Sequence, residues 1–84
     1  MTWRVVIVPQ AQKAYRRLSS AAQSRITLHL RQLAENPRSA GIKKLRDRPG
    51  FRLRIGDYRV LYAIDDGIHV VEVRKVGHRK DIYD

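Results

Sequence analysis

The sequence predicts an α+β domain in which a helical hairpin packs on a mainly antiparallel sheet, in the order β-α-α-β-β-β. Apolar residues recur at helical spacing in the first half of the chain and at every second position in its last third. The chain has 84 residues, which is enough for one small hydrophobic core and too few for two. We therefore expect a single domain that spans residues 1–84.

The first half begins with a short β-branched segment, residues 3–8, which we expect to form a largely buried strand. Pro9 ends this strand and can occupy the first turn of a helix. Ser19 and Ser20 interrupt the helical pattern and can cap a second helix, which Pro37 stops. The apolar positions are Ala11, Ala14, Tyr15 and Leu18 in the first helix and Ala22, Ile26, Leu30 and Leu33 in the second.

From Phe51 onwards the hydrophobic period changes from 3.6 residues to 2. The last predicted strand is apolar on both faces in its first half, so we expect it to lie in the centre of the sheet. The predicted strands are residues 51–55, 58–64 and 68–76, separated by turns at Gly56-Asp57 and Asp65-Asp66-Gly67.

Charge is the most informative part of the composition. The chain has 18 basic and 8 acidic residues, a formal net charge of +10, and thirteen of its basic residues are arginines. Residues 38–59 are the densest positive stretch, with eight basic residues against two acidic ones. Arginine suits bidentate contacts with phosphate, so a polyanionic partner is indicated. The alternatives are a solvated, solubilising surface and a basic helix on a membrane surface.

Several classes of protein are excluded by what the sequence lacks. There is no cysteine, so a disulfide scaffold, a thiolate zinc site and a cysteine nucleophile are excluded. Three widely spaced histidines make a poor metal-binding set, and we expect neither a metal nor a cofactor. The longest uncharged apolar run, residues 5–8, is too short to span a membrane, and we expect a cytoplasmic protein.

The predicted strand at residues 51–55 carries a candidate phosphate-binding site. Arg52 and Arg54 alternate with apolar residues, so they share one strand face about 7 Å apart, close to the spacing of consecutive phosphates. Arg59 lies on the next strand, and three guanidiniums converge if the register places it on the same face. An ordinary polar outer face of a sheet is the alternative. Further candidates for phosphate binding in this basic stretch are Lys43, Lys44 and Arg46.

The C-terminal tail supplies groups that can move protons. His78, Arg79 and Tyr83 follow the last predicted strand and bring an imidazole, a guanidinium and a phenol to one edge of the sheet. Histidine can shuttle protons near neutral pH, and a phenol can act as a base once nearby cations lower its pKa. In the alternative interpretation, Ile82 and Tyr83 only dock the end of the chain.

These motifs together resemble the RelE/ParE superfamily of bacterial and archaeal type II toxins, particularly its RelE branch. The opening strand, the helical hairpin and Lys44-Leu45 fit too, so the resemblance covers essentially the whole chain. The residues that carry it are FRLRIGDYRVLY at 51–62, DDG at 65–67 and VGHRKDIY at 76–83.

The resemblance implies a ribosome-dependent endoribonuclease that enters the A site of the 30S subunit and cleaves messenger RNA. Such toxins contact ribosomal RNA and messenger, use the messenger's own 2′-hydroxyl as nucleophile and need no metal. It also implies a cognate RelB-like antitoxin that wraps the toxin in a hetero-oligomeric complex.

The resemblance further implies roles for individual residues. Arg52 and Arg54 match basic strand residues that bind phosphate, although the family's best-studied pattern has lysines there. Arg59 and Arg79 match arginines that stabilise the transition state. Tyr83 matches a tyrosine implicated in proton transfer or base stacking, and His78 stands where other members carry a basic residue. Arginine stays protonated, so proton transfer is left to His78 or Tyr83.

Two other functions compete with this interpretation. A ParE-like poison of DNA gyrase would share the fold, but such toxins lack the basic and tyrosine set formed by Arg59, Arg79 and Tyr83. A non-catalytic module that binds RNA or the ribosome needs only the basic face, and it would bind in a salt-sensitive manner without cleaving.

Overall fold

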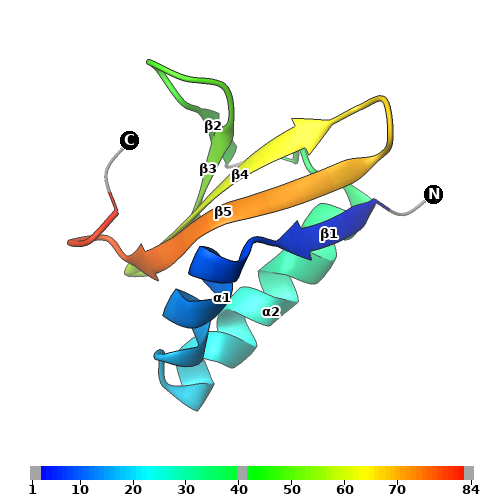
Figure 1. The fold of residues 1–84 in the computed structure, drawn as a ribbon. Coiled ribbons are helices and arrows are strands. Elements are labelled where there is room, and N and C mark those ends of the chain that lie inside the picture. The colour runs from blue at the N-terminus through cyan, green and yellow to red at the C-terminus, as the bar shows by residue number, and fades with distance from the viewer. Residues whose placement is uncertain (1–2, 40–41, 83–84) are drawn as a thin grey trace.

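The computed structural model describes residues 3–39 and 42–82 of the chain (Figure 1). Within them the strands form one five-stranded sheet in the order β1-β5-β4-β3-β2. β1 runs parallel to β5, and the other pairs are antiparallel. Both helices cover the same face of this sheet (Figure 1), so the predicted α+β architecture is confirmed. The elements are β1 (Arg4–Ile7), α1 (Pro9–Arg16), α2 (Ser20–Glu35), β2 (Ile42–Lys44), β3 (Phe51–Ile55), β4 (Tyr58–Asp65) and β5 (Val70–His78).

The two helices begin where the sequence predicts. Pro9 opens α1, and the Ser19 hydroxyl caps α2 by accepting a hydrogen bond from the Ala22 amide at 3.2 Å. The predicted apolar positions of α2 are all buried, and Ile26, Leu30 and Leu33 belong to the core cluster shared with the sheet. Tyr15 of α1 and Thr27 of α2 join the hairpin through a hydroxyl–hydroxyl hydrogen bond of 2.6 Å. Neither helix has the length and apolar character needed to cross a membrane.

The sheet differs from the prediction at both edges. β1 is an edge strand rather than a largely buried one, because it pairs with β5 alone and Val6 is 40% exposed. β2 was not predicted, since a three-residue strand with two lysines carries no alternating pattern. β5 lies between β1 and β4, as expected for the last strand, but it continues to His78.

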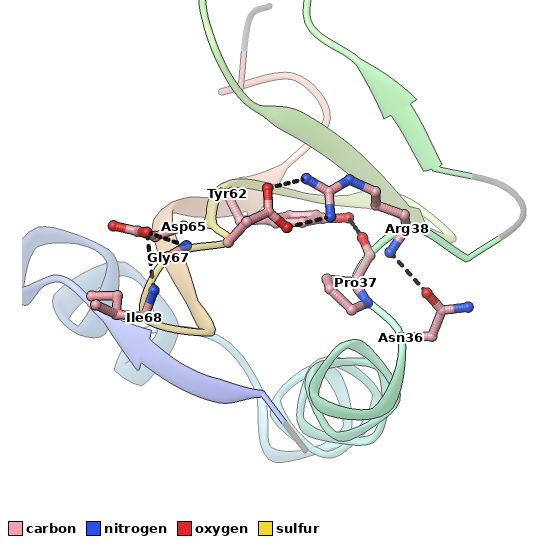
Figure 2. A network of polar contacts seen from close by, with 8 residues as sticks. Asn36, Pro37, Arg38, Tyr62, Asp65, Gly67 and Ile68 are labelled. Atoms are coloured by element: carbon pink, nitrogen blue, oxygen red, sulfur yellow. Dashed lines mark hydrogen bonds and ion pairs between the residues drawn. The ribbon is translucent and has the colours of Figure 1, made fainter. Parts of the chain in front are cut away.

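The core lies between the helices and the sheet, where Ile26, Val60 and Val71 are completely buried. Tyr62 of β4 is also buried, and its hydroxyl donates a hydrogen bond of 2.7 Å to the Pro37 carbonyl oxygen (Figure 2). This bond satisfies a polar group that would otherwise be costly to bury. It ties the segment that follows α2 to the middle of the sheet.

A second contact anchors that segment at the β4–β5 turn. Arg38 donates two hydrogen bonds of 2.9 Å to the Asp66 carboxylate, in a bidentate arrangement (Figure 2). The same guanidinium lies 5.8 Å from the centre of the Phe51 ring. The Arg38 side chain holds the pKa of the Asp66 carboxyl below its ordinary value. Pro37 and Arg38 are thereby held against β3, β4 and the turn that follows β4.

Replacing Tyr62 with phenylalanine is expected to lower the free energy of unfolding by about 1 kcal/mol at neutral pH, because one buried hydrogen bond is lost. Burial raises the pKa of Tyr62 well above its ordinary value. Above about pH 10 the tyrosine therefore ionises in the unfolded chain before it ionises in the folded one, and stability falls. Urea titrations below and above that pH should show that the variant loses less stability at alkaline pH than the wild type. An equal loss in both proteins would contradict the burial of the Tyr62 hydroxyl.

Candidate nucleic-acid interface

The face of the sheet opposite the helices, called here the open face, carries three arginines at its β3–β4 end. Leu53 and Ile55 of β3 are buried towards the helices, so the alternating residues Arg52 and Arg54 lie on the open face. The antiparallel register pairs Arg54 with Arg59 of β4. Directly paired residues share a face, so Arg59 lies on the open face beside Arg54.

Arg59 is held by the turn between β3 and β4. Its Nη1 donates hydrogen bonds of 2.8 Å to the carbonyl oxygens of Gly56 and Tyr58. Gly56 has a φ of 58°, the left-handed conformation that glycine adopts easily in such a turn. The guanidinium is therefore positioned by backbone atoms rather than left free in solvent.

The surroundings of Arg59 lower the pKa of its guanidinium. Partial burial, together with the guanidiniums of Arg54, Arg52 and Arg79, lowers the pKa of Arg59, and only Asp57 opposes this. The group remains charged at neutral pH because arginine starts from a very high pKa. An anion such as a phosphate would relieve the mutual repulsion. We call Arg52, Arg54, Arg59 and Arg79 the arginine cluster.

Arg79 reaches the arginine cluster from the C-terminal tail. Its backbone amide donates a hydrogen bond of 2.7 Å to the Asp57 carbonyl oxygen, and its Nε lies 3.8 Å from the Asp57 carboxylate. Figure 1 shows the chain after β5 bending beside the β3–β4 turn. Both partners are largely exposed, so this ion pair is weak and leaves the guanidinium accessible.

The structure does not bring His78 to the open face. Its pairing with Tyr58 places it on the helix-covered face, where the two rings meet edge to face with centroids 5.8 Å apart. The Lys80 amide donates a hydrogen bond of 3.1 Å to His78 Nδ1. A neutral ring with this bond carries its proton on Nε2, so it has no free lone pair with which to act as a base. Tyr83 lies outside the described residues.

The other predicted basic residues fall on different sides of the sheet. Lys43 of β2 pairs with Arg52, so it shares the open face with the arginine cluster. Lys44 pairs with Phe51 and lies on the opposite face. Arg46 is exposed in the loop between β2 and β3, which a hydrogen bond of 3.0 Å from the Leu45 amide to the Gly50 carbonyl oxygen closes. Of these three, the register groups only Lys43 with the cluster.

Two residues of this region were not singled out in the sequence. Arg25 of α2 packs on the β3–β4 turn so closely that a Cβ at Gly56 would lie 2.7 Å from its Nη2 atom. A helical pattern alone cannot place such a contact. Asp57 places a carboxylate beside the cluster, and the available signal was an acidic residue within the most basic stretch of the chain. Across residues 3–39 and 42–82, no three His, Asp or Glu side chains gather as metal ligands would.

Comparison with known proteins identifies the family. The family model for the ParE toxin of the parDE type II toxin–antitoxin system matches residues 5–83. The chain belongs to this toxin family. Membership of the RelE/ParE superfamily, predicted from the strand and tail motifs, is thus confirmed.

One curated relative of this toxin carries the RelE name. Toxin RelE of Mycobacterium tuberculosis is 44% identical over 52 residues, 61% of this chain and 54% of that protein. The match thus spans about half the length of the curated relative.

Solved structures match over nearly the whole toxin. The archaeal RelE–RelB complex from Pyrococcus horikoshii is 30% identical with a TM-score of 0.83, covering 98% of this chain and 100% of that one. The isolated RelE toxin of E. coli is 28% identical with a TM-score of 0.81, covering 90% and 83% of the two chains. The fold of the toxin is therefore that of RelE.

Proposed function

We propose that this toxin is a ribosome-dependent endoribonuclease that cuts messenger RNA in the A site of the 30S subunit. The observation that carries the proposal is the pairing of Arg54 with Arg59 on the open face, with Arg52 beside them. Arg79 approaches the same turn from the tail. Relatives named RelE support the assignment to this branch.

The arginine cluster suits a reaction in which RNA supplies its own nucleophile. The 2′-oxygen of one nucleotide attacks the adjacent phosphorus, and the bond to the 5′-oxygen of the next nucleotide breaks. The products are a 2′,3′-cyclic phosphate and a 5′-hydroxyl, and negative charge builds up on the phosphoryl oxygens in the transition state. Fixed guanidiniums stabilise that charge without reorganisation. In this proposal Arg59 and Arg79 clamp the scissile phosphate, while Arg52, Arg54 and Lys43 hold its neighbours.

Proton transfer is assigned to the tail. The 2′-hydroxyl must lose a proton and the leaving 5′-oxygen must gain one. His78 accepts a hydrogen bond at Nδ1, so its neutral ring can donate from Nε2 but cannot accept. Tyr83 is left as the base, a role in which a guanidinium beside the phenol would favour the ionised form.

Replacing Tyr83 with phenylalanine is therefore expected to abolish most messenger cleavage while binding to ribosomes persists. General-base catalysis contributes about 10²–10⁴-fold, so the loss should lie in that range. Single-turnover cleavage and ribosome co-sedimentation measure the two properties separately. The matched change is His78→Ala: if it alone stops cleavage and Tyr83→Phe is active, the roles are reversed.

An antitoxin is the proposed protein partner. The similar P. horikoshii structure is a RelE–RelB complex. The similar M. tuberculosis structure is the RelBE2 toxin–antitoxin complex. The uncompensated net charge of +10 favours a partner with acidic segments. Co-purification with the product of the neighbouring reading frame tests this partner. The proposed site of action is the cytoplasm, where ribosomes translate.

Poisoning of DNA gyrase is the second candidate, because the matching family model describes the ParE toxin. Primer extension on translating ribosomes, with and without the purified toxin, decides between the two. New messenger ends at the A-site codon are expected for the nuclease. Intact messenger together with DNA damage and filamentation in expressing cells would instead assign the toxin to gyrase.

A further inference from the structure

Asp57 places a carboxylate beside the arginine cluster. It lies in the β3–β4 turn, where its side chain is 66% exposed. It is one of only two acidic residues in the basic stretch 38–59. A negative charge opposes the binding of a polyanion. Affinity for RNA therefore does not explain this carboxylate.

Asp57 contacts Arg79 through both its backbone and its side chain. The Asp57 carbonyl oxygen accepts a hydrogen bond of 2.7 Å from the Arg79 amide, and the carboxylate lies 3.8 Å from the Arg79 Nε atom. The first contact fixes where the Arg79 side chain starts, and the second favours one direction for it. Because the carboxylate lies at the Nε side of the guanidinium, the two terminal nitrogens stay available for a bidentate contact with phosphate.

The far end of the tail is anchored independently of this ion pair. Ile82 packs over Gly77, where a Cβ would lie 3.2 Å from the Ile82 Cδ1 atom. Gly77 is the register partner of Arg59 in the pairing of β4 with β5. Loss of the Asp57 carboxylate therefore leaves the tail docked on the sheet and acts mainly on the direction of the Arg79 side chain.

The Asp57 carboxylate also reduces repulsion within the arginine cluster. The other three guanidiniums of the cluster lower the pKa of Arg59, whereas Asp57 raises it. Like charges at this spacing repel, so in the free toxin the Arg79 side chain is pushed away from the cluster unless a negative group offsets the repulsion. An ion pair between two exposed groups is weak, so a phosphate can bind the same guanidinium without a large cost.

We propose that Asp57 is a positioning residue that holds the Arg79 guanidinium in the direction from which it meets the scissile phosphate. The proposal rests on the proposed function, since Arg79 is assigned to that phosphate there. The carboxylate acts through Arg79 and does not touch the reacting atoms. Because the direction is set before RNA binds, less side-chain freedom is lost when the phosphate is clamped.

Replacing Asp57 with asparagine is expected to slow single-turnover cleavage about fivefold at saturating toxin, which is the size of effect that an exposed ion pair supports. Asparagine keeps the backbone contact and suits a turn. The variant has one negative charge fewer, so it should bind ribosomes at least as tightly as the wild type. The loss therefore falls on the rate and not on binding. Asp57→Glu keeps the charge and should recover most of the rate.

Asp47→Asn is the matched control. Asp47 is the other acidic residue of the basic stretch, and it is exposed in the loop between β2 and β3. This change raises the net charge by the same amount without removing a contact to Arg79. Its cleavage rate at saturation should therefore equal that of the wild type.

A measurement on the free toxin separates this proposal from the proposed function. In nuclear magnetic resonance spectra, the Nε–H signal of Arg79 should shift, and its exchange with water should accelerate, in Asp57→Asn but not in Asp47→Asn. An unchanged Arg79 signal overturns the positioning role, as does a cleavage rate in Asp57→Asn that equals or exceeds that of the wild type. Equal slowing in Asp47→Asn also overturns it, because net charge would then be the cause. Absence of cleavage by the wild type is a different result, which overturns the proposed function itself.

Discussion

Replacing Arg59 with alanine is expected to slow messenger cleavage on ribosomes by about 10²–10³-fold, as the loss of one preorganised donor to a transition-state oxyanion does elsewhere. The Arg59 guanidinium is both fixed by the backbone and able to donate further hydrogen bonds. Its Nη1 is bound to the Gly56 and Tyr58 carbonyl oxygens, which fixes the guanidinium beside Arg54. The remaining donors of the guanidinium are then presented on the open face without an entropic cost at the moment of reaction.

Single-turnover cleavage with saturating toxin isolates this effect from ribosome binding. Arg31→Ala is the charge-matched control, because Arg31 is exposed on α2 and lies outside the arginine cluster. Arg59→Lys keeps the charge but has no planar fork, so it should recover only part of the rate. Full activity of Arg59→Ala, with a normal unfolding transition, would remove Arg59 from the catalytic site.

Replacing Ile26 with alanine is expected to lower the free energy of unfolding by about 2–5 kcal/mol, because it leaves a cavity between α2 and the sheet. Ile26 is completely buried in the core cluster with Leu30 and Val60. Domains of this size have only about 5–10 kcal/mol of stability, so the variant should be close to its unfolding midpoint in mild conditions. Equilibrium urea denaturation followed by circular dichroism measures the change.

Leu28→Ala is the matched control on the same helix. Leu28 is 55% exposed, so its truncation should change stability by no more than about 0.5 kcal/mol. The two variants lose similar side-chain volume from positions two residues apart in α2 and differ mainly in burial. Equal destabilisation of both variants would contradict the position of α2 against the sheet.

The helices and the β3–β4 hairpin could be predicted because their signals are local. Periodicity placed Ile26 on the buried face of α2, and the short Gly56-Asp57 turn set the hairpin. The strands at the edges depend on partners distant in sequence. β1 pairs with β5 about 66 residues later in the chain, and nothing in residues 3–8 indicates that one of its sides stays unpaired. β2 forms because β3 offers it an edge, not because its own residues favour a strand.

The residues of the candidate site were likewise predictable where their signals are local and not where they depend on distant pairing. Alternation alone put Arg52 and Arg54 on one face, and a two-residue turn brought Arg59 opposite Arg54. The position of His78 depends on how far β5 extends. The irregularity in β5 opposite Leu61 and Tyr62, together with the strand's continuation to His78, determines the face on which the imidazole lies. Sequence periodicity does not reveal such a shift in register.

β4 separates opposite charges along its length. It begins beside Arg54 and Arg59 and ends at Asp65, next to Asp66 of the following turn. The β3–β4 end of the strand therefore carries unbalanced positive charge, whereas Asp66 at the other end is paired with Arg38. A polyanion exerts a torque on such a particle during diffusion and turns the β3–β4 end towards itself before contact. Productive encounters are thereby enriched over random collisions, and this enrichment fades as added electrolyte shortens the range of the field.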